Sequence, residues 1–380
     1  MENNELKRII IDYLSGTFSL DLVGDENERV KVFEYVEAWR EFLHLDDCQI
    51  QECSYATNNF RYQYILSDYI TLRLAGPENE FGMKTCQIEM KGEGCREFER
   101  LRPDLKWIDL FYFLMEFDTN FKRLDVTIDD LSGNQIKIED VFKKIKNGYY
   151  TSVFRSEPKY HGILDTGLTI DMGSRKSLIE LCIYDKLKQQ QALNKEVEND
   201  YWCRYEMRFR QEKANAVVID LIKNYKNNDI PIYGIDLKAF AIKSLYAILD
   251  LKIDNNSNAK HQSDIQTDSK WLKFLENTEK GILPKAETRI STSETRFNYI
   301  MPKAKMIILQ WILECNFDPN MFLERILSEE LDLLKGTTKS QLYRFNQYLK
   351  EKNKPKVNFE QFDELISNID RMLDERSLPF

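Results

Sequence analysis

The periodicity of apolar residues changes between residues 210 and 235, and this change constrains the fold more than any other feature of the sequence. Up to about residue 210, short runs alternate apolar and polar residues with the period of two that is typical of strands, and helical segments separate them. Beyond residue 235, apolar residues recur three and four positions apart, as in amphipathic helices. We therefore predict an α+β fold, with an antiparallel-sheet domain over residues 1–232 and an all-helical C-terminal domain over residues 233–380.

The same patterns predict the individual elements. Strands are expected at 9–18, 59–66, 69–75, 84–91, 121–130, 151–155, 166–172, 178–184 and 202–210, and helices of the first domain at 26–45, 107–117 and 138–148. Helices of the second domain are expected at 235–251, 306–315, 321–335, 340–352 and 359–375, with a polar linker at 255–270. The order of elements repeats loosely in two halves, about 1–120 and 121–232, without a repeated sequence that would establish a duplication.

Composition excludes several classes of protein. With 42% hydrophobic residues, the chain can bury a real core. No apolar run is long enough for a transmembrane span, and the N-terminus lacks the pattern of a signal peptide, so we expect a cytoplasmic protein without a membrane partner. The seven cysteines form no CxxC pair, which argues against a disulfide framework and a structural zinc site.

Charge and histidine content limit the chemistry further. The three histidines are widely separated, so a metal would depend on carboxylates, which favours Mg²⁺ or Mn²⁺. The net charge of −9 argues against nucleic-acid binding as a bulk property. It remains compatible with a local basic groove formed by some of the 54 Lys and Arg residues.

Three predicted strands carry polar residues on one face. Because alternate side chains of a strand point the same way, each of these strands has one apolar and one polar side. The polar sets are Arg123, Asp125, Thr127 and Asp129 in the first strand, Glu180, Cys182, Tyr184 and Lys186 in the second, and Arg204, Glu206 and Arg208 in the third. We expect the acids to form a site for a divalent cation on a solvent-accessible side of the sheet, and Tyr184 to be able to attack a phosphodiester. Any half-exposed antiparallel strand also shows this alternation, so one strand alone would carry little weight.

A short turn precedes the tyrosine strand. Gly173, Ser174, Arg175 and Lys176 join two predicted strands, and their small side chains and two cations suit the approach of a backbone phosphate. An ordinary basic hairpin turn explains the same residues equally well.

The order and spacing of these segments resemble the replication initiation factor family, Rep_trans. The resemblance rests on four segments in this order: RLDVTID, GSRKS, IYDK and CRYEMRFR. The tyrosine of IYDK is the seventh residue after GSRKS, and the resemblance spans roughly residues 9–280. This family includes initiators of rolling-circle plasmids and relaxases of integrative conjugative elements, and MKGEGCREFE and KWLKFLENTEK are similar to the conjugative branch.

The resemblance implies a function and a set of site residues. Tyr184 would be the nucleophile of a DNA nicking-closing enzyme, leaving a 5′-phosphotyrosyl link and a free 3′-hydroxyl, with Lys186 and Arg123 as its catalytic partners. Asp125, Asp129 and Glu206 would bind Mg²⁺ or Mn²⁺. The DNA-binding residues would be Gly173, Ser174, Arg175, Lys176, Arg204 and Arg208. Many plasmid members have an arginine where this chain has Cys182.

The implied partners are origin DNA, as a nicked single strand or hairpin, and a host helicase of superfamily 1 type, since no GxxxxGK[ST] motif is present. A homodimer is a further expectation. The site residues do not separate a conjugative relaxase from a plasmid initiator, and a non-catalytic origin-binding protein is the alternative of another class. The C-terminal helices fit either DNA recognition and helicase docking, or packing and dimerisation. The basic stretch 280–305, with Phe297 and Tyr299, fits either contact with a nucleic-acid backbone or a solvated surface connection.

Overall fold

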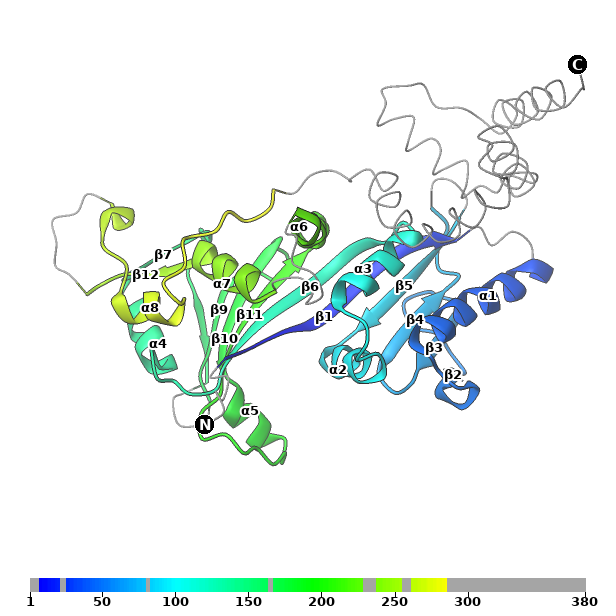
Figure 1. Cartoon of the computed structure of the whole chain (residues 1–380), viewed down its shortest axis with the longest axis horizontal. Coiled ribbons are helices and arrows are strands. Elements are labelled where there is room, and N and C mark those ends of the chain that lie inside the picture. Colours follow the sequence, from blue (N-terminus) through cyan, green and yellow to red (C-terminus); the bar gives the residue numbers. More distant parts are fainter. Residues whose placement is uncertain are drawn as a thin grey trace, which may run out of the picture.

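A ten-stranded antiparallel sheet runs through the whole length of the structure (Figure 1). This computed structural model describes residues 7–20, 25–79, 83–162, 167–227, 237–254 and 261–285. The strands of the sheet are β1 (Lys7–Leu20), β2 (Ile50–Glu52), β3 (Tyr62–Leu66), β4 (Ile70–Leu74), β5 (Lys84–Met90), β6 (Asn120–Asp130), β8 (Lys159–His161), β9 (Thr169–Gly173), β10 (Ile179–Asp185) and β11 (Cys203–Arg210). A second, two-stranded sheet pairs β7 (Tyr150–Ser152) with β12 (Leu249–Leu251).

The two halves of the large sheet have the same arrangement. The long strands β1 and β6 pair at its centre, and the full order is β2-β3-β4-β5-β1-β6-β11-β10-β9-β8. In the N-terminal half, β1 is central, β5 pairs with it, and β4, β3 and β2 follow outward. In the C-terminal half, β6 is central, β11 pairs with it, and β10, β9 and β8 follow outward. The loose repeat of elements along the sequence therefore corresponds to a repeat of topology about the β1–β6 contact.

Of the described helices, all but α5 cover one face of the sheet. They are α1 (Asp25–Leu43), α2 (Gly92–Leu101), α3 (Trp107–Glu116), α4 (Ile138–Lys146), α6 (Glu212–Asn227), α7 (Leu237–Ile248) and α8 (Ser269–Phe274). The exception, α5 (Lys186–Ala192), directly follows β10 and has no buried residue. In the N-terminal half, Trp39 of α1 packs edge-on against Phe113 of α3 at 4.9 Å between ring centroids. In the C-terminal half, Tyr205 of β11 packs against Phe274 of α8 at 4.9 Å. These contacts belong to one continuous apolar core under both halves.

The predicted fold class is confirmed, with local differences. The strands and helices predicted for the first domain are present, but the strands β2 and β8 and the helices α2, α5 and α6 are additional elements that the sequence pattern does not predict. The sequence of α2 begins with two glycines within three residues, which are poor helix formers, so its apolar positions alone did not mark a helix. None of the described helices is long and apolar enough to cross a membrane.

The chain beyond residue 232 begins within the same core. Residues Leu237–Ile248 form α7 as predicted, but 249–251 leave the helix and pair with β7, so the predicted helix ends early. Both α7 and α8 contribute fully buried side chains, including Leu245 and Trp271, to the core of the sheet domain. The helices predicted at 306–315, 321–335, 340–352 and 359–375 lie outside the described residues, as does the stretch from 286 to 305.

Candidate active site

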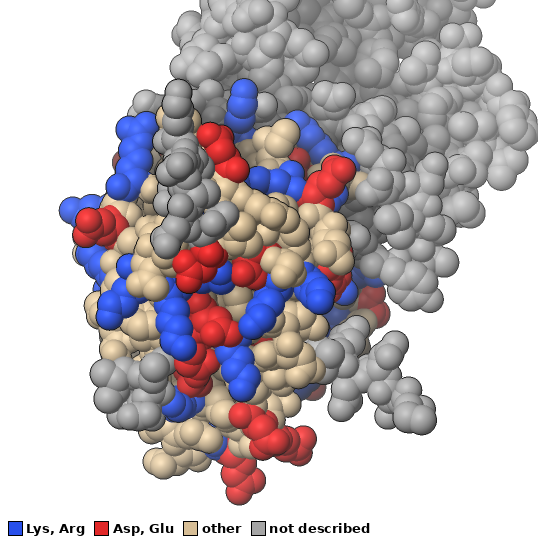
Figure 2. Space-filling model, turned by 90° about the vertical axis from the view of Figure 1, so that its left-hand side faces the viewer, with Lys and Arg blue, Asp and Glu red and all other residues tan. Residues whose placement is uncertain are grey.

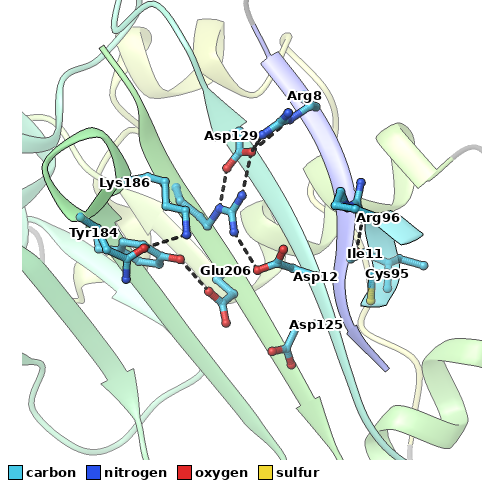
Figure 3. Close-up of polar contacts among 12 residues, drawn as sticks. Arg8, Ile11, Asp12, Cys95, Arg96, Asp125, Asp129, Tyr184, Lys186 and Glu206 are labelled. Carbon is cyan, nitrogen blue, oxygen red and sulfur yellow. Dashed lines mark hydrogen bonds and ion pairs between the residues drawn. The ribbon is translucent and has the colours of Figure 1, made fainter. Parts of the chain in front are cut away.

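The predicted nucleophile lies in the middle of a charged cluster on the sheet face opposite the core (Figure 3). We call this side the polar face; it carries Tyr184, Arg204, Glu206, Asp125 and Tyr13. The hydroxyl of Tyr184 donates a hydrogen bond to Oε2 of Glu206 at 3.1 Å. Tyr184 is 8% exposed, and burial, followed by the charge of Glu206, raises its pKa above the ordinary value. A partner that accepts the phenolic proton is therefore already in contact with it.

Lys186 lies next to this tyrosine. Its Nζ is 5.6 Å from the centroid of the Tyr184 ring and donates to Gln189 in α5 at 2.7 Å. Burial, helped by the nearby charge of Arg204, lowers the pKa of Lys186. The predicted neighbours therefore share one site, with the ammonium group over the ring of the phenol.

Two acids, Asp125 of β6 and Glu206 of β11, are diagonal neighbours on these adjacent strands. Arg208 donates to Oε1 of Glu206 at 2.7 Å, and Arg123 binds both oxygens of Asp125 at 2.5 to 3.1 Å. Nη2 of Arg123 also comes within 4.0 Å of Glu206. Burial raises the pKa of Asp125 to about 7 against the effect of Arg123, and the charge of Glu206 adds to the rise. Each acid of the pair beside the tyrosine is therefore bound to its own arginine.

The third predicted acid, Asp129, has a different environment. Its side chain is fully buried and accepts from Arg204 at 2.6 and 3.0 Å and from Arg8 at 2.9 Å. Burial alone would raise the pKa of Asp129, but the hydrogen bonds and charge of Arg204 hold it below the usual value. Both carboxylate oxygens are thus occupied by guanidinium groups.

Asp12 is a residue of this cluster that the sequence did not reveal. The β1–β6 register shifts between Ile11 and Tyr13, so Asp12 is the extra residue of a β-bulge, a feature often found next to active sites. Its carboxylate accepts from Nη1 of Arg204 at 2.7 Å, which places Arg204 between Asp12 and Asp129. The only sequence signal for a role of Asp12 is its position at the edge of an apolar run, and the run IIIDYL by itself predicts a plain strand.

The predicted DNA-binding residues fall into two groups. Ser174, Arg175 and Lys176 are exposed in the turn between β9 and β10, at the opposite end of β10 from Tyr184. Gly173 has a φ of +91° and its missing Cβ would lie 2.7 Å from Phe154, so its local conformation already requires glycine. Arg204, by contrast, is buried, and Arg208 is partly buried between Glu206 and Glu180.

The cluster is more buried than predicted. The sequence predicts a site on a solvent-accessible side of the sheet. In the structure, arginines and acids on adjacent strands shield one another, and exposure is at most 6% for Asp125, Asp129, Glu206 and Arg204. Figure 2 shows the end of the molecule that lies at the left of Figure 1, where Lys and Arg side chains lie among Asp and Glu without a large region of one sign. Among the described residues, this end of the molecule therefore shows no groove lined by basic residues alone.

The arrangement of the acids limits how they could hold a metal ion. In the part of the chain that the structure describes, no group of three or more His, Cys, Asp or Glu side chains is placed to hold an ion. Mg²⁺, however, is commonly held by one or two carboxylates, with water and substrate phosphate completing its shell. All three acids have both oxygens hydrogen-bonded in this structure: Asp125 to Arg123, Glu206 to Arg208 and Tyr184, and Asp129 to Arg204. Asp125 and Glu206 fit the pattern better than Asp129, because the side chains of Arg123 and Arg208 are 29% and 21% exposed, whereas that of Arg204 is 4% exposed.

We expect Asp125→Asn to alter how the stability of the metal-free protein depends on pH. An unfolded aspartate has a pKa near ~3.9, so the native state, with Asp125 near 7, retains a proton that the unfolded state has lost between those values. That contribution to stability is complete below the unfolded pKa and is lost as the pH rises through 7. Urea unfolding in EDTA at several pH values from 5 to 8 should therefore show the variant gaining stability relative to the wild type. A difference that stays constant with pH would contradict the shifted pKa.

Comparison with known proteins identifies a family. The sequence matches the replication initiation factor family, Rep_trans, over residues 119–308, which is half of the chain. It is 34% identical over 166 residues to a protein of Bacillus subtilis (strain 168) named "Putative DNA relaxase NicK", covering 41% of this chain and 46% of that protein. The chain thus matches about half the length of this curated relative.

The fold has a solved counterpart. A rolling circle replication initiator protein from Geobacillus stearothermophilus superimposes with a TM-score of 0.54 and 22% sequence identity, covering 73% of this chain and all of that one. At this identity the similarity establishes the fold. Together with the family match over the strands that carry Asp125, Tyr184 and Glu206, it leads to one conclusion: the chain belongs to the replication initiation factor family.

Proposed function

We propose that this chain is a site-specific single-strand DNA endonuclease and strand transferase, which nicks an origin to start conjugative transfer or rolling-circle replication. The observation that carries the proposal is the hydrogen bond from the Tyr184 hydroxyl to Glu206 inside a buried cluster of arginines and acids. Membership of the family and the name of the Bacillus subtilis relative support the same activity.

In the proposed nicking step, Oη of Tyr184 attacks a phosphorus atom of one DNA strand and its proton passes to Oε2 of Glu206, 3.1 Å away. The bond from phosphorus to the 3′-oxygen breaks, and that oxygen takes a proton to become a free 3′-hydroxyl. A 5′-phosphotyrosyl link forms. Because this link conserves the energy of the phosphodiester, attack by a 3′-hydroxyl reverses the step and reseals the strand without ATP.

Nearby cations would stabilise the charge that develops on the phosphate. Lys186 lies over the phenol ring, and Arg123 and Arg208 bind the neighbouring acids Asp125 and Glu206. Arg123 is the better candidate of the two arginines for direct phosphate contact, because its side chain is 29% exposed and Arg208 is 21% exposed. Arg204 would act less directly, by orienting Asp12 and Asp129.

A divalent cation, Mg²⁺ or Mn²⁺, is part of the proposal. Asp125 and Glu206 would hold it, and when bound it would supply positive charge to the phosphate oxygens. Asp129 stays a predicted ligand from the family resemblance, although both of its oxygens are paired with arginine. In the proposed arrangement, Arg123 and Arg208 continue to fix the orientation of the two ligand carboxylates.

Removal of the metal is expected to abolish cleavage while leaving DNA binding largely intact. The arginines and Lys186 provide the attraction to phosphate, whereas the charge on the reacting phosphate would no longer be neutralised by the ion. Cleavage of a labelled oligonucleotide and its binding by fluorescence anisotropy should be measured in EDTA, and again after titration with Mn²⁺. Full cleavage in EDTA would contradict the metal requirement.

The deciding experiment for the function is incubation with supercoiled and single-stranded origin DNA in the presence of Mn²⁺. We expect protein joined covalently to DNA 5′ ends, detected as a labelled band that resists SDS and disappears after protease treatment. Specific binding of the origin without any covalent product would favour the non-catalytic origin-binding protein. Origin DNA, a host helicase of superfamily 1 type and a second copy of the chain are the proposed partners.

A further inference from the structure

The ring of Tyr13 lies against Arg123, the arginine proposed to contact the phosphate. Tyr13 follows the bulge of β1 and pairs with Asp125 of β6 across the sheet. The guanidinium carbon of Arg123 is 4.1 Å from the centroid of the Tyr13 ring, which is a close cation–π contact. The same guanidinium binds both oxygens of Asp125, so Arg123 is held on one side by an aromatic ring and on another by an acid.

The hydroxyl of Tyr13 is itself anchored in the N-terminal half of the sheet. It donates a short hydrogen bond to Glu89 of β5, and the same carboxylate accepts from both Nη atoms of Arg73 of β4 at 3.1 Å. Arg73 is 8% exposed, and its Nε donates to Thr57 at 2.9 Å and to Gln63 of β3 at 3.2 Å. The orientation of the Tyr13 ring is therefore determined by residues up to three strands away from β1.

These contacts form a continuous path across the sheet. From Arg73 and Glu89 it passes through Tyr13 to Arg123 and Asp125, and Arg123 then approaches Glu206, which accepts from Tyr184. Every member lies on the polar face, and the path crosses from the N-terminal half into the C-terminal half at the central β1–β6 pair. Asp12 and Arg8 of β1 also reach the cluster, but Tyr13 is the residue through which the N-terminal half contacts Arg123.

Tyr13 is poorly suited to be a second nucleophile. Its hydroxyl donates to Glu89 of β5, which also binds Arg73 of β4, so the hydroxyl is held in the N-terminal half and not beside Glu206. The ring, and not the hydroxyl, is the part of Tyr13 that faces the site.

We propose that Tyr13 is a positioning residue that holds Arg123 in the geometry needed to contact the scissile phosphate, and that the N-terminal half of the sheet acts on the reaction through it. This inference rests on the proposed nicking function. A long arginine side chain that is 29% exposed has many conformations available, and stacking on a fixed ring removes most of them before DNA arrives. The effect should therefore appear in the cleavage step more than in DNA affinity.

The test compares Tyr13→Phe with Tyr13→Leu in single-turnover cleavage of an origin oligonucleotide with Mn²⁺. The phenylalanine retains the ring and should cleave within about threefold of the wild-type rate, whereas the leucine should slow cleavage at saturating DNA by about tenfold. The dissociation constant for the oligonucleotide should change by less than about threefold in both variants. Tyr13→Met replaces Tyr13→Leu if the leucine variant does not fold.

Two further variants separate positioning from a general structural role. In an Arg123→Met background, Tyr13→Leu should have almost no additional effect on the rate, because the side chain it positions is gone. Tyr64→Leu, a buried core change on β3 of the same half, controls for loss of stability and should leave the rate of the folded protein unchanged.

The outcomes are distinct. No cleavage by the wild-type protein would reject the proposed function, and the inference with it. Cleavage by the wild type together with an unaffected Tyr13→Leu variant would reject the inference alone. The inference is also rejected if Tyr13→Phe is as slow as Tyr13→Leu, or if Tyr13→Leu slows the Arg123→Met protein as much as the wild type.

Discussion

Tyr184→Phe should reduce DNA nicking by at least about a thousandfold, because the variant has no oxygen that can form the bond to phosphorus. The change removes one hydrogen bond, to Glu206, and keeps the ring under Lys186, so the fold should lose only about 0.5–1.5 kcal/mol. Binding of the same oligonucleotide should persist. The measurement is the yield of SDS-resistant protein–DNA product from a labelled strand, followed over time.

Tyr160→Phe is a matched control for this experiment. Tyr160 belongs to β8 of the same half of the sheet, but it pairs with Ile170 and packs against Phe142 on the core side. Its hydroxyl should therefore be irrelevant to nicking. If Tyr184→Phe still formed covalent product at the wild-type rate while Tyr160→Phe did not, the assignment of the nucleophile would be wrong.

Arg204→Met should be the most destabilising change at the site. Arg204 is 4% exposed at its side chain and joins Asp129 and Asp12, which lie on two different strands. Removing the guanidinium leaves Asp129, which is fully buried, with only the half-exposed Arg8 as a cationic partner. Loss of one member of a buried ion pair typically costs about 3–5 kcal/mol. Urea denaturation at pH 7 should therefore show a free energy of unfolding lowered by about that amount.

Arg29→Met is the corresponding surface control. Arg29 and its partner Glu52 are 70% and 42% exposed at their side chains, and an exposed pair contributes about 0–1 kcal/mol. A loss at Arg204 no larger than that at Arg29 would mean that the buried network around Asp129 does not stabilise the fold. In that case Asp129 would be available as the metal ligand that the family resemblance implies.

The strands could be predicted because the sequence of each strand indicates which of its two sides is buried. In β6, Leu124, Val126 and Ile128 alternate with polar residues and are all fully buried in the core. The same alternation in β10 and β11 correctly placed Tyr184 and Glu206 on one face. Helices with weak or short apolar patterns could not be predicted. In α2, for example, the two glycines of the first turn are poor helix formers, and three apolar positions are too few to indicate a helix.

The partners within the site could not be predicted in the same way. Asp125, Asp129 and Glu206 look equivalent in sequence, yet Asp129 is engaged by two arginines, whereas Glu206 contacts the tyrosine. The difference depends on register, because Asp129 pairs opposite Arg204 and Glu206 pairs opposite Thr127. No local pattern encodes that register.

The sequence alone was sufficient to assign each strand one polar and one apolar side, the α+β class, and a likeness to one family. These properties follow from a period of two and from short motifs, which involve residues only a few positions apart. Which charges meet was decided only when the strands assembled: Arg204 and Asp12 are separated by 192 residues, and a single bulge brings Asp12 into the site. Strand order and a one-residue shift of register determine such contacts, and both are properties of the sheet as a whole.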